Sequence, residues 1–166
     1  MFVAHLPSGY LLGRGLLGRG AGARGPAMAA VLLGSVAPDF DMLWFHLVDH
    51  GRVHHHDYYS HIPGFWLLVA LSVLAVLRGL RPAWVTIAAM FFAGIFLHLV
   101  LDTLVGGIMW LWPFSDHLYS LAVVPARHDH WVISFILHWS FLAEIVLTLL
   151  AAWVLWRDRR RVSAIR

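Results

Sequence analysis

The chain has 166 residues, of which 60% are hydrophobic and only 13% are charged, and its mean hydropathy is +0.74. Because a soluble domain carries about 25% charged residues, this composition indicates an integral membrane protein with a single domain, residues 1–166. The chain contains no cysteine, which excludes disulfides and thiolate metal sites. Its net charge of +3 comes from arginines beside apolar blocks, a pattern typical of membrane topology and not of nucleic-acid binding.

Apolar stretches follow one another along the chain, at residues 1–19, 27–47, 62–77, 83–101 and 131–156. Ten of the twelve arginines lie at one set of ends of these stretches, at positions 14, 19, 24, 78, 81, 157, 159, 160, 161 and 166. Arginine-rich ends favour the cytoplasm. The sequence therefore predicts an all-α, polytopic membrane bundle of about five membrane-embedded helices, with the N-terminus outside.

The opposite ends of the same stretches carry the histidines and acids. They are His5, Asp39, Asp41, the cluster at 54–61, His98, Asp102, His117 and the residues from His128 to His130. Histidines that merely decorate a membrane interface would fall at both ends. Their gathering on one side predicts a functional site on the outer, periplasmic face.

The residue types and their spacing indicate metal binding. His98 and Asp102 are four residues apart, on one face of a helix. Asp39 and Asp41 repel each other unless a cation or proton lies between them. Imidazole and carboxylate ligands suit zinc, with manganese or iron as less favoured ions, and the number of ligands allows about two ions. A bound ion lowers the pKa of its water to ~7, which favours hydrolysis.

Another pair, His56 and His61, is five residues apart, so a straight helix would point the two side chains in different directions. A turn that runs into a helix start at Pro63 would let them converge, because proline fits the first helical turn. We therefore expect a turn, not a helix, at 54–61.

Four motifs in order, "AHLP", "PDFD", "HDYYSH" and "HLVLDTLVGGIMWLWPF", cover roughly residues 1–118. They resemble the LexA-regulated, YdjM-like family of inner-membrane metal-dependent hydrolases, which is distantly similar to zinc-dependent phospholipases C. The resemblance implies a bacterial inner membrane location. It also implies metal ligands at His5, Asp39, His56, His61, His98 and Asp102, with Asp41 as a further ligand or as the carboxylate that orients one. Met42 departs from the pattern, since relatives often carry histidine there.

The expected function is a hydrolase of a membrane lipid, a phospholipid or polyprenyl phosphoester, in which a metal-bound hydroxide attacks. A free imidazole, His55 or His117, would protonate the leaving oxygen, and Arg52 or Arg127 would hold a phosphate. The alternatives are a metal or proton transporter or sensor, and a purely structural metal site. His128, His130, His138 and Glu144 have no assigned role. Polar groups as deep in an apolar stretch as His138 and Glu144 are either functional or pair helices.

Overall fold

The computed structural model describes residues 3–18 and 25–163, so Arg19, Arg24 and Arg166 of the arginine pattern lie outside the described residues. The long helices are α1 (His5–Leu17), α2 (Pro26–Gly34), α4 (Pro63–Leu80), α5 (Val85–Asp102) and α7 (Phe141–Ser163); α3 (Asp41–Leu47) and α6 (Trp131–Ile136) are short. Over the described ranges the only strand-like pairing is an isolated antiparallel bridge between Ile108 and Tyr119. The predicted all-α class is confirmed.

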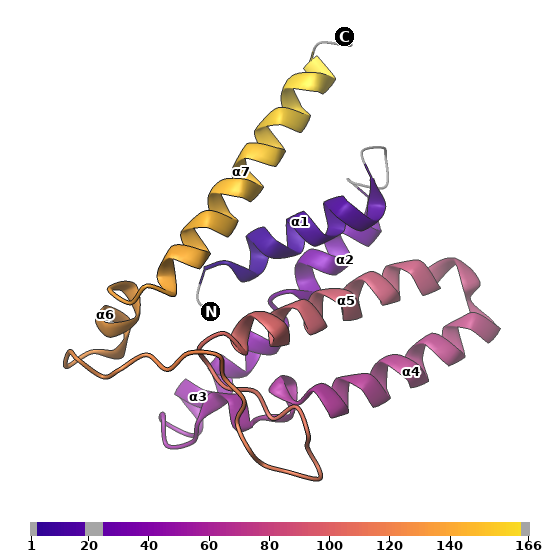
Figure 1. Ribbon diagram of the computed structural model, residues 1–166. Coiled ribbons are helices and arrows are strands. Elements are labelled where there is room, and N and C mark those ends of the chain that lie inside the picture. The colour runs from indigo at the N-terminus through magenta and orange to yellow at the C-terminus, as the bar shows by residue number, and fades with distance from the viewer. Residues whose placement is uncertain (1–2, 19–24, 164–166) are drawn as a thin grey trace.

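Helix α5 lies at the centre of the fold and packs against α1, α2 and α4 (Figure 1). One apolar core, which includes Phe92, Ile95 and Leu99, lies between α4 and α5. A second, around Met28 and Val31, joins α2 to α1 and α5. Helix α7 packs on α1 and extends away from the α4–α5 hairpin.

The backbones of α2 and α5 touch because glycine lies at their crossing. A Cβ added to Gly94 would lie 2.3 Å from the carbonyl oxygen of Val31, and one added to Gly34 would lie 2.0 Å from that of Phe91. Helices in membranes use small residues in this way to approach closely. This crossing holds the residue after α2, Ser35, against the last turns of α5.

Within residues 3–18 and 25–163, two helices are long and apolar enough to cross a membrane, Pro63–Leu80 and Pro82–Asp102. A third span is possible if Pro26–Gly34 and Pro38–Leu47 count as one, although the pair is bent by 57° at the break before Pro38. Only 11% of the first span and 39% of the second are buried inside the protein, so most of their side chains lie outside its interior. The prediction of five passes is wrong for the described residues.

Two predicted passes fail for different physical reasons. Helix α1 has 13 residues, about 20 Å by helical rise, against ~30 Å for the hydrocarbon core. The last stretch is interrupted between Ile136 and Phe141, which divides it into α6 and α7. Within α7, charges at Glu144 and from Arg157 onward leave only 12 residues between them without a charge.

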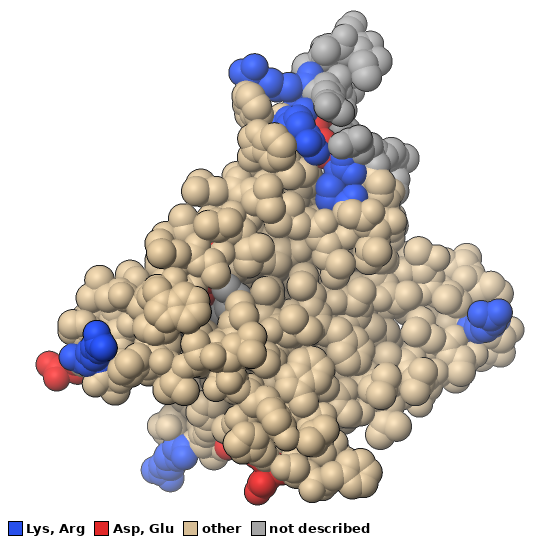
Figure 2. All heavy atoms as spheres, in the orientation of Figure 1, with Lys and Arg blue, Asp and Glu red and all other residues tan. Residues whose placement is uncertain are grey.

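Exposed arginine side chains lie at the periphery of the molecule. Figure 2 shows arginines gathered around the C-terminal end of α7 and at the tip of the α4–α5 hairpin, with a broad uncharged surface between them. Large apolar side chains on α7 such as Leu149 and Trp153 are exposed in the same way. An apolar surface of this extent is expected of a protein surrounded by lipid.

Candidate metal centre

The C-terminal turn of α5 supplies His98 and Asp102, which are 0% and 1% exposed. Their spacing along the helix places His98 Nε2 3.0 Å from Asp102 Oδ2, as the four-residue interval predicts. Burial of an imidazole beside a carboxylate at the end of an apolar helix needs a compensating charge or hydrogen bonds.

The acidic pair divides between two roles. Asp39 lies in a 3-10 turn, Pro38–Phe40, and its Oδ1 is 3.6 Å from His98 Nε2 and 3.8 Å from His61 Nε2. Asp41 begins α3 and contacts the other side of the His61 ring, with Oδ2 2.9 Å from Nδ1. Of the two roles left open for Asp41, the geometry fits the carboxylate that orients a ligand.

His56 and His61 converge because two consecutive 3-10 turns, His55–Asp57 and Tyr59–His61, precede Pro63 at the start of α4. The two rings lie with centroids 4.7 Å apart. Both side chains are buried, at 4% and 0% exposure. The predicted turn into the helix start is confirmed.

Three imidazoles share one arrangement of their ring nitrogens. His98 Nδ1 donates to the Ser35 carbonyl at 2.9 Å, His56 Nδ1 donates to the Gly106 carbonyl at 2.8 Å, and His61 Nδ1 meets Asp41. Because a carbonyl only accepts, Nδ1 of His56 and of His98 carries a proton, and Nε2 is the ring nitrogen that faces the cluster. Metal-ligating histidines are held in this way by a second partner.

The loop after α5 contacts the His56 ring through Gly106. A Cβ on Gly106 would lie 2.1 Å from the His56 ring atom Cε1, so only glycine leaves room for the imidazole against the backbone. The same residue supplies the carbonyl that His56 needs.

His5, the first residue of α1, completes the cluster. Its ring stacks on that of His98 at 3.8 Å between centroids. Nε2 is 3.1 Å from Asp102 Oδ1 and Nδ1 is 3.5 Å from Asp39 Oδ2, yet neither buried nitrogen has an acceptable hydrogen bond. Buried polar atoms normally have a partner. This orphaned pair, with the mixed imidazole and carboxylate donors around it, fits a cation.

In the described part of the chain, two groups of side chains could hold a metal ion, each with ligand atoms within 4.8 Å of one another. One consists of Asp39, His61, His98 and Asp102, and the other of His55, His56 and His61. His61 belongs to both. Asp102 also links them, since its Oδ2 lies 3.7 Å from Nε2 of both His56 and His61.

The electrostatics of the 55–61 turn depend on the nearby acids. Burial alone would lower the pKa of His61, but interactions with Asp39 and Asp41 raise it to about 9. Burial lowers the pKa of His55 to about 4 and that of His56 to about 3, and in both cases the neighbouring His61 adds to the shift. The acids thus favour positive charge at His61, and a metal ion would also supply positive charge there.

A cavity of about 400 Å³ opens beside the cluster. Asp39 and the imidazoles of residues 54–56 form its polar part, whereas Met42, Val105, Val124 and Phe135 supply apolar lining. Asp39 is 36% exposed while His61, His98 and Asp102 are at most 2% exposed. The cluster is therefore reached from the cavity through Asp39.

Other predicted site residues lie elsewhere. Among the described residues, the His117 ring packs on Tyr119 at 4.7 Å, is exposed, and lines neither the cavity nor the cluster. Arg52 and Arg127 are also exposed and do not line the cavity, although Arg127 directly follows the lining residue Ala126. His55, in contrast, lines the cavity with its ring 3.9 Å from that of His56.

The histidines and the acid left without a role fall into separate places. His128 and His130 are exposed near the start of α6. His138 Nδ1 pairs with Ser140 Oγ at 2.8 Å. Glu144 is fully buried and accepts backbone hydrogen bonds from the residues before α1.

Sequence reasoning predicted Asp41 but missed the backbone groups that orient His56 and His98. The Ser35 and Gly106 contacts use main-chain carbonyls, which carry no side-chain signal. A signal did exist for Gly106, because it follows the His98–Asp102 motif by four residues within a Gly-Gly turn. Val124 and Phe135 line the cavity. The sequence offered no reason to place them there, since Val124 lies between two apolar stretches and Phe135 lies within one that was predicted to be a membrane pass.

The fold and the cluster together define a helical membrane protein with a buried His/Asp centre that could hold a metal ion. The chain matches the YdjM inner membrane protein family over residues 1–162 and belongs to that family. No curated protein and no solved structure matches the chain.

Proposed function

We propose that the protein is a metal-dependent hydrolase of the inner membrane that cleaves a phosphoester of a phospholipid or polyprenyl lipid. The observation that carries the proposal is the convergence of Nε2 atoms of His61 and His98 on Asp39 and Asp102, at the base of a cavity with apolar lining. The family resemblance and the donor set favour zinc, with manganese or iron as alternatives.

In the proposed site, Asp39, His61, His98 and Asp102 hold the ion, and His5 closes the ligand set from the side of α1. A divalent cation bound there would lower the pKa of a water and stabilise negative charge on phosphoryl oxygens. A second ion would use His55 and His56 together with His61.

The remaining residues would bind the substrate and move protons. The apolar side chains of Met42, Val105 and Phe135 would contact hydrocarbon, which orients the polar end of an amphiphile toward Asp39. His55 lines the cavity next to His56 and is the imidazole placed to exchange a proton with the substrate. The site faces the periplasm in this proposal, because α1, α4 and α5 each carry a cluster residue at or next to one end and arginine at or next to the other.

A screen of lipid phosphoesters with the purified protein in detergent tests this function. We expect a metal-dependent turnover that His98→Ala lowers by about a hundredfold or more, since loss even of an outer-shell partner costs up to about that much. His117→Ala is the matched control, an exposed histidine outside the cavity, and should retain wild-type turnover.

Equal background turnover in the wild type and in His98→Ala would contradict the proposal that the protein is a hydrolase. Metal-dependent ion flux into liposomes would instead favour the transporter. A transport path through the membrane would need polar residues deep in the apolar segments, and the candidates are His138 and Glu144. His138 contacts Ser140, and Glu144 accepts a hydrogen bond from Ala4 at the start of α1.

A further inference from the structure

The chain has one glutamate, and that residue is fully buried. Glu144 lies in the first turn of α7 with 0% exposure. Its Oε2 accepts hydrogen bonds from the backbone N–H groups of Val3 and Ala4, the second at 3.1 Å. These contacts join the segment before α1 to the first turn of α7, and Ala4 and Glu144 are 140 residues apart in the sequence.

Helix α1 lacks the local residues that usually complete a helix start. Its N-cap is Ala4, whose side chain cannot accept a hydrogen bond, and its first turn contains no acid. The first N–H groups of a helix need acceptors, and a carboxylate near them also interacts favourably with the helix dipole. From another helix, Glu144 places a carboxylate next to this helix start and accepts hydrogen bonds from the N-cap residue Ala4 and from Val3, the residue before it.

The residue that follows Ala4 is His5, whose ring stacks on His98 and faces Asp102. No side chain at the N-cap of α1 accepts a hydrogen bond, and the first turn of α1 contains no acid. Because His5 directly follows Ala4, a shift of the N-terminal segment would carry His5 out of the cluster. We infer that Glu144 is a positioning residue that holds His5 at the metal centre. The inference goes beyond the proposed function, since it concerns the placement of His5 whatever reaction the site performs.

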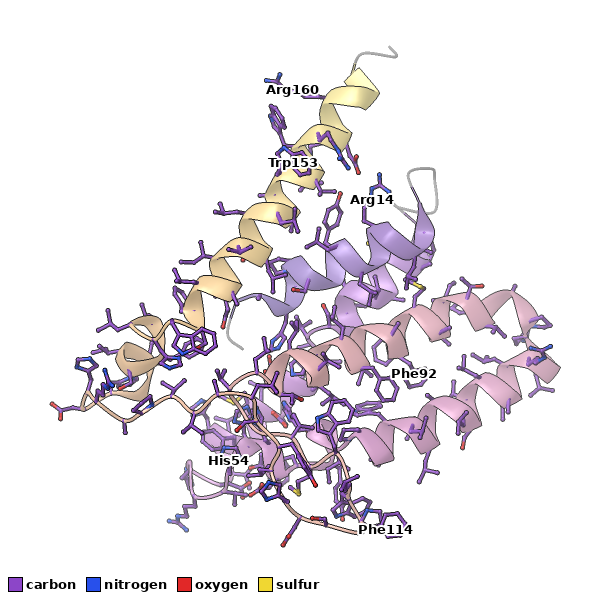
Figure 3. The ribbon with its side chains drawn as sticks, in the orientation of Figure 1. Arg14, His54, Phe92, Phe114, Trp153 and Arg160 are labelled. Atoms are coloured by element: carbon purple, nitrogen blue, oxygen red, sulfur yellow. The ribbon has the colours of Figure 1, made fainter. Side chains whose placement is uncertain are left out.

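A second contact between α1 and α7 allows the effect of Glu144 on His5 to be distinguished from a general loosening of the packing between these helices. Arg14, near the C-terminal end of α1, forms an ion pair and hydrogen bonds with Asp158 of α7 (Figure 3). Asp158→Asn weakens the contact between α1 and α7 at the end of α1 that is far from His5. A loss that comes only from loosened packing would therefore follow from either variant.

Zinc dissociation constants of the full-length protein in detergent measure the effect on the cluster. Glu144→Ala should raise the constant about tenfold, as loss of an orienting partner typically does. Glu144→Gln, which keeps an acceptor oxygen, should stay within about threefold of the wild type, and so should Asp158→Asn. Because Glu144 acts through His5, the double variant with His5→Ala should bind zinc no more weakly than His5→Ala alone.

The chemical reactivity of His5 gives a readout that needs no metal. Its ring is 3% exposed, so diethyl pyrocarbonate should modify it slowly in the metal-free wild type, faster in Glu144→Ala, and at the wild-type rate in Asp158→Asn. Additive losses in the double variant, or an unchanged His5 rate in a folded Glu144→Ala protein, would overturn the inference. If even the wild type binds no zinc, the proposed function fails, while the His5 rate still decides the role of Glu144.

Discussion

At the scale of single residues, the directions of the His56, His61 and His98 rings are set by the group that each Nδ1 contacts. Backbone carbonyls of Ser35 and Gly106 fix His98 and His56, and the carboxylate of Asp41 fixes His61. The His98–Asp102 contact follows from helix spacing and was predictable from the sequence. The carbonyl partners were not, because their positions depend on the α2–α5 crossing and on the loop after α5.

Asp41 is expected to act through His61 and not as a direct ligand. Asp41→Asn should weaken zinc binding by about tenfold, because the amide holds the ring less firmly than a carboxylate. Competition with a chromogenic chelator measures the constant. Asp57→Asn is the control, since Asp57 is exposed and its recorded ion-pair contact is to His54 at 3.9 Å. Complete loss of zinc from Asp41→Asn would make Asp41 a direct ligand instead.

At the scale of helices, the sequence identified the apolar segments but not their ends. The stretches that became α4 and α5 were predicted closely, because each is long and free of internal charge. The last stretch was read as a single pass, although it breaks before Phe141 and buries Glu144. Such a break follows from tertiary contacts, among them the one between Glu144 and the start of α1, which periodicity does not reveal.

The close crossing of α2 and α5 should be sensitive to a single methyl group. Gly94→Ala places a Cβ 2.3 Å from the Val31 carbonyl oxygen, so the helices must separate, at a cost of about 1–3 kcal/mol. Zinc affinity should fall as well, since Ser35 moves away from His98. Gly79→Ala is the matched control because its Cβ meets nothing within 4 Å. Thermal unfolding in detergent compares them, and equal midpoints would contradict the packing described.

At the scale of the whole molecule, the cluster assembles because several segments end at one place. His5 begins α1, His61 precedes α4, Asp102 ends α5 and Asp39 lies in the turn before α3. The sequence predicted this convergence from the placement of arginines at the other ends, and the structure brings those four residues together. The number of passes was overestimated because apolar composition reveals neither that α1 is too short to span a membrane nor that the last stretch breaks before Phe141.

The membrane orientation can be tested with introduced thiols because the native chain has no cysteine. Gly79→Cys lies at the arginine-flanked end of α4, and Asp116→Cys lies in the exposed loop after α5. A membrane-impermeant maleimide added to spheroplasts should label residue 116 and not residue 79, as the arginine distribution predicts. The reverse labelling would place the cluster on the cytoplasmic side.

The metal content of the purified protein tests the central claim most directly. Elemental analysis of the wild type, extracted in detergent without chelators, should find at least stoichiometric zinc, manganese or iron. A variant with both Asp39→Asn and Asp102→Asn should lose it, since these acids would supply the carboxylate ligands of the four-residue group. Trace metal at equal levels in the folded wild type and the folded variant would contradict a metal centre at this site.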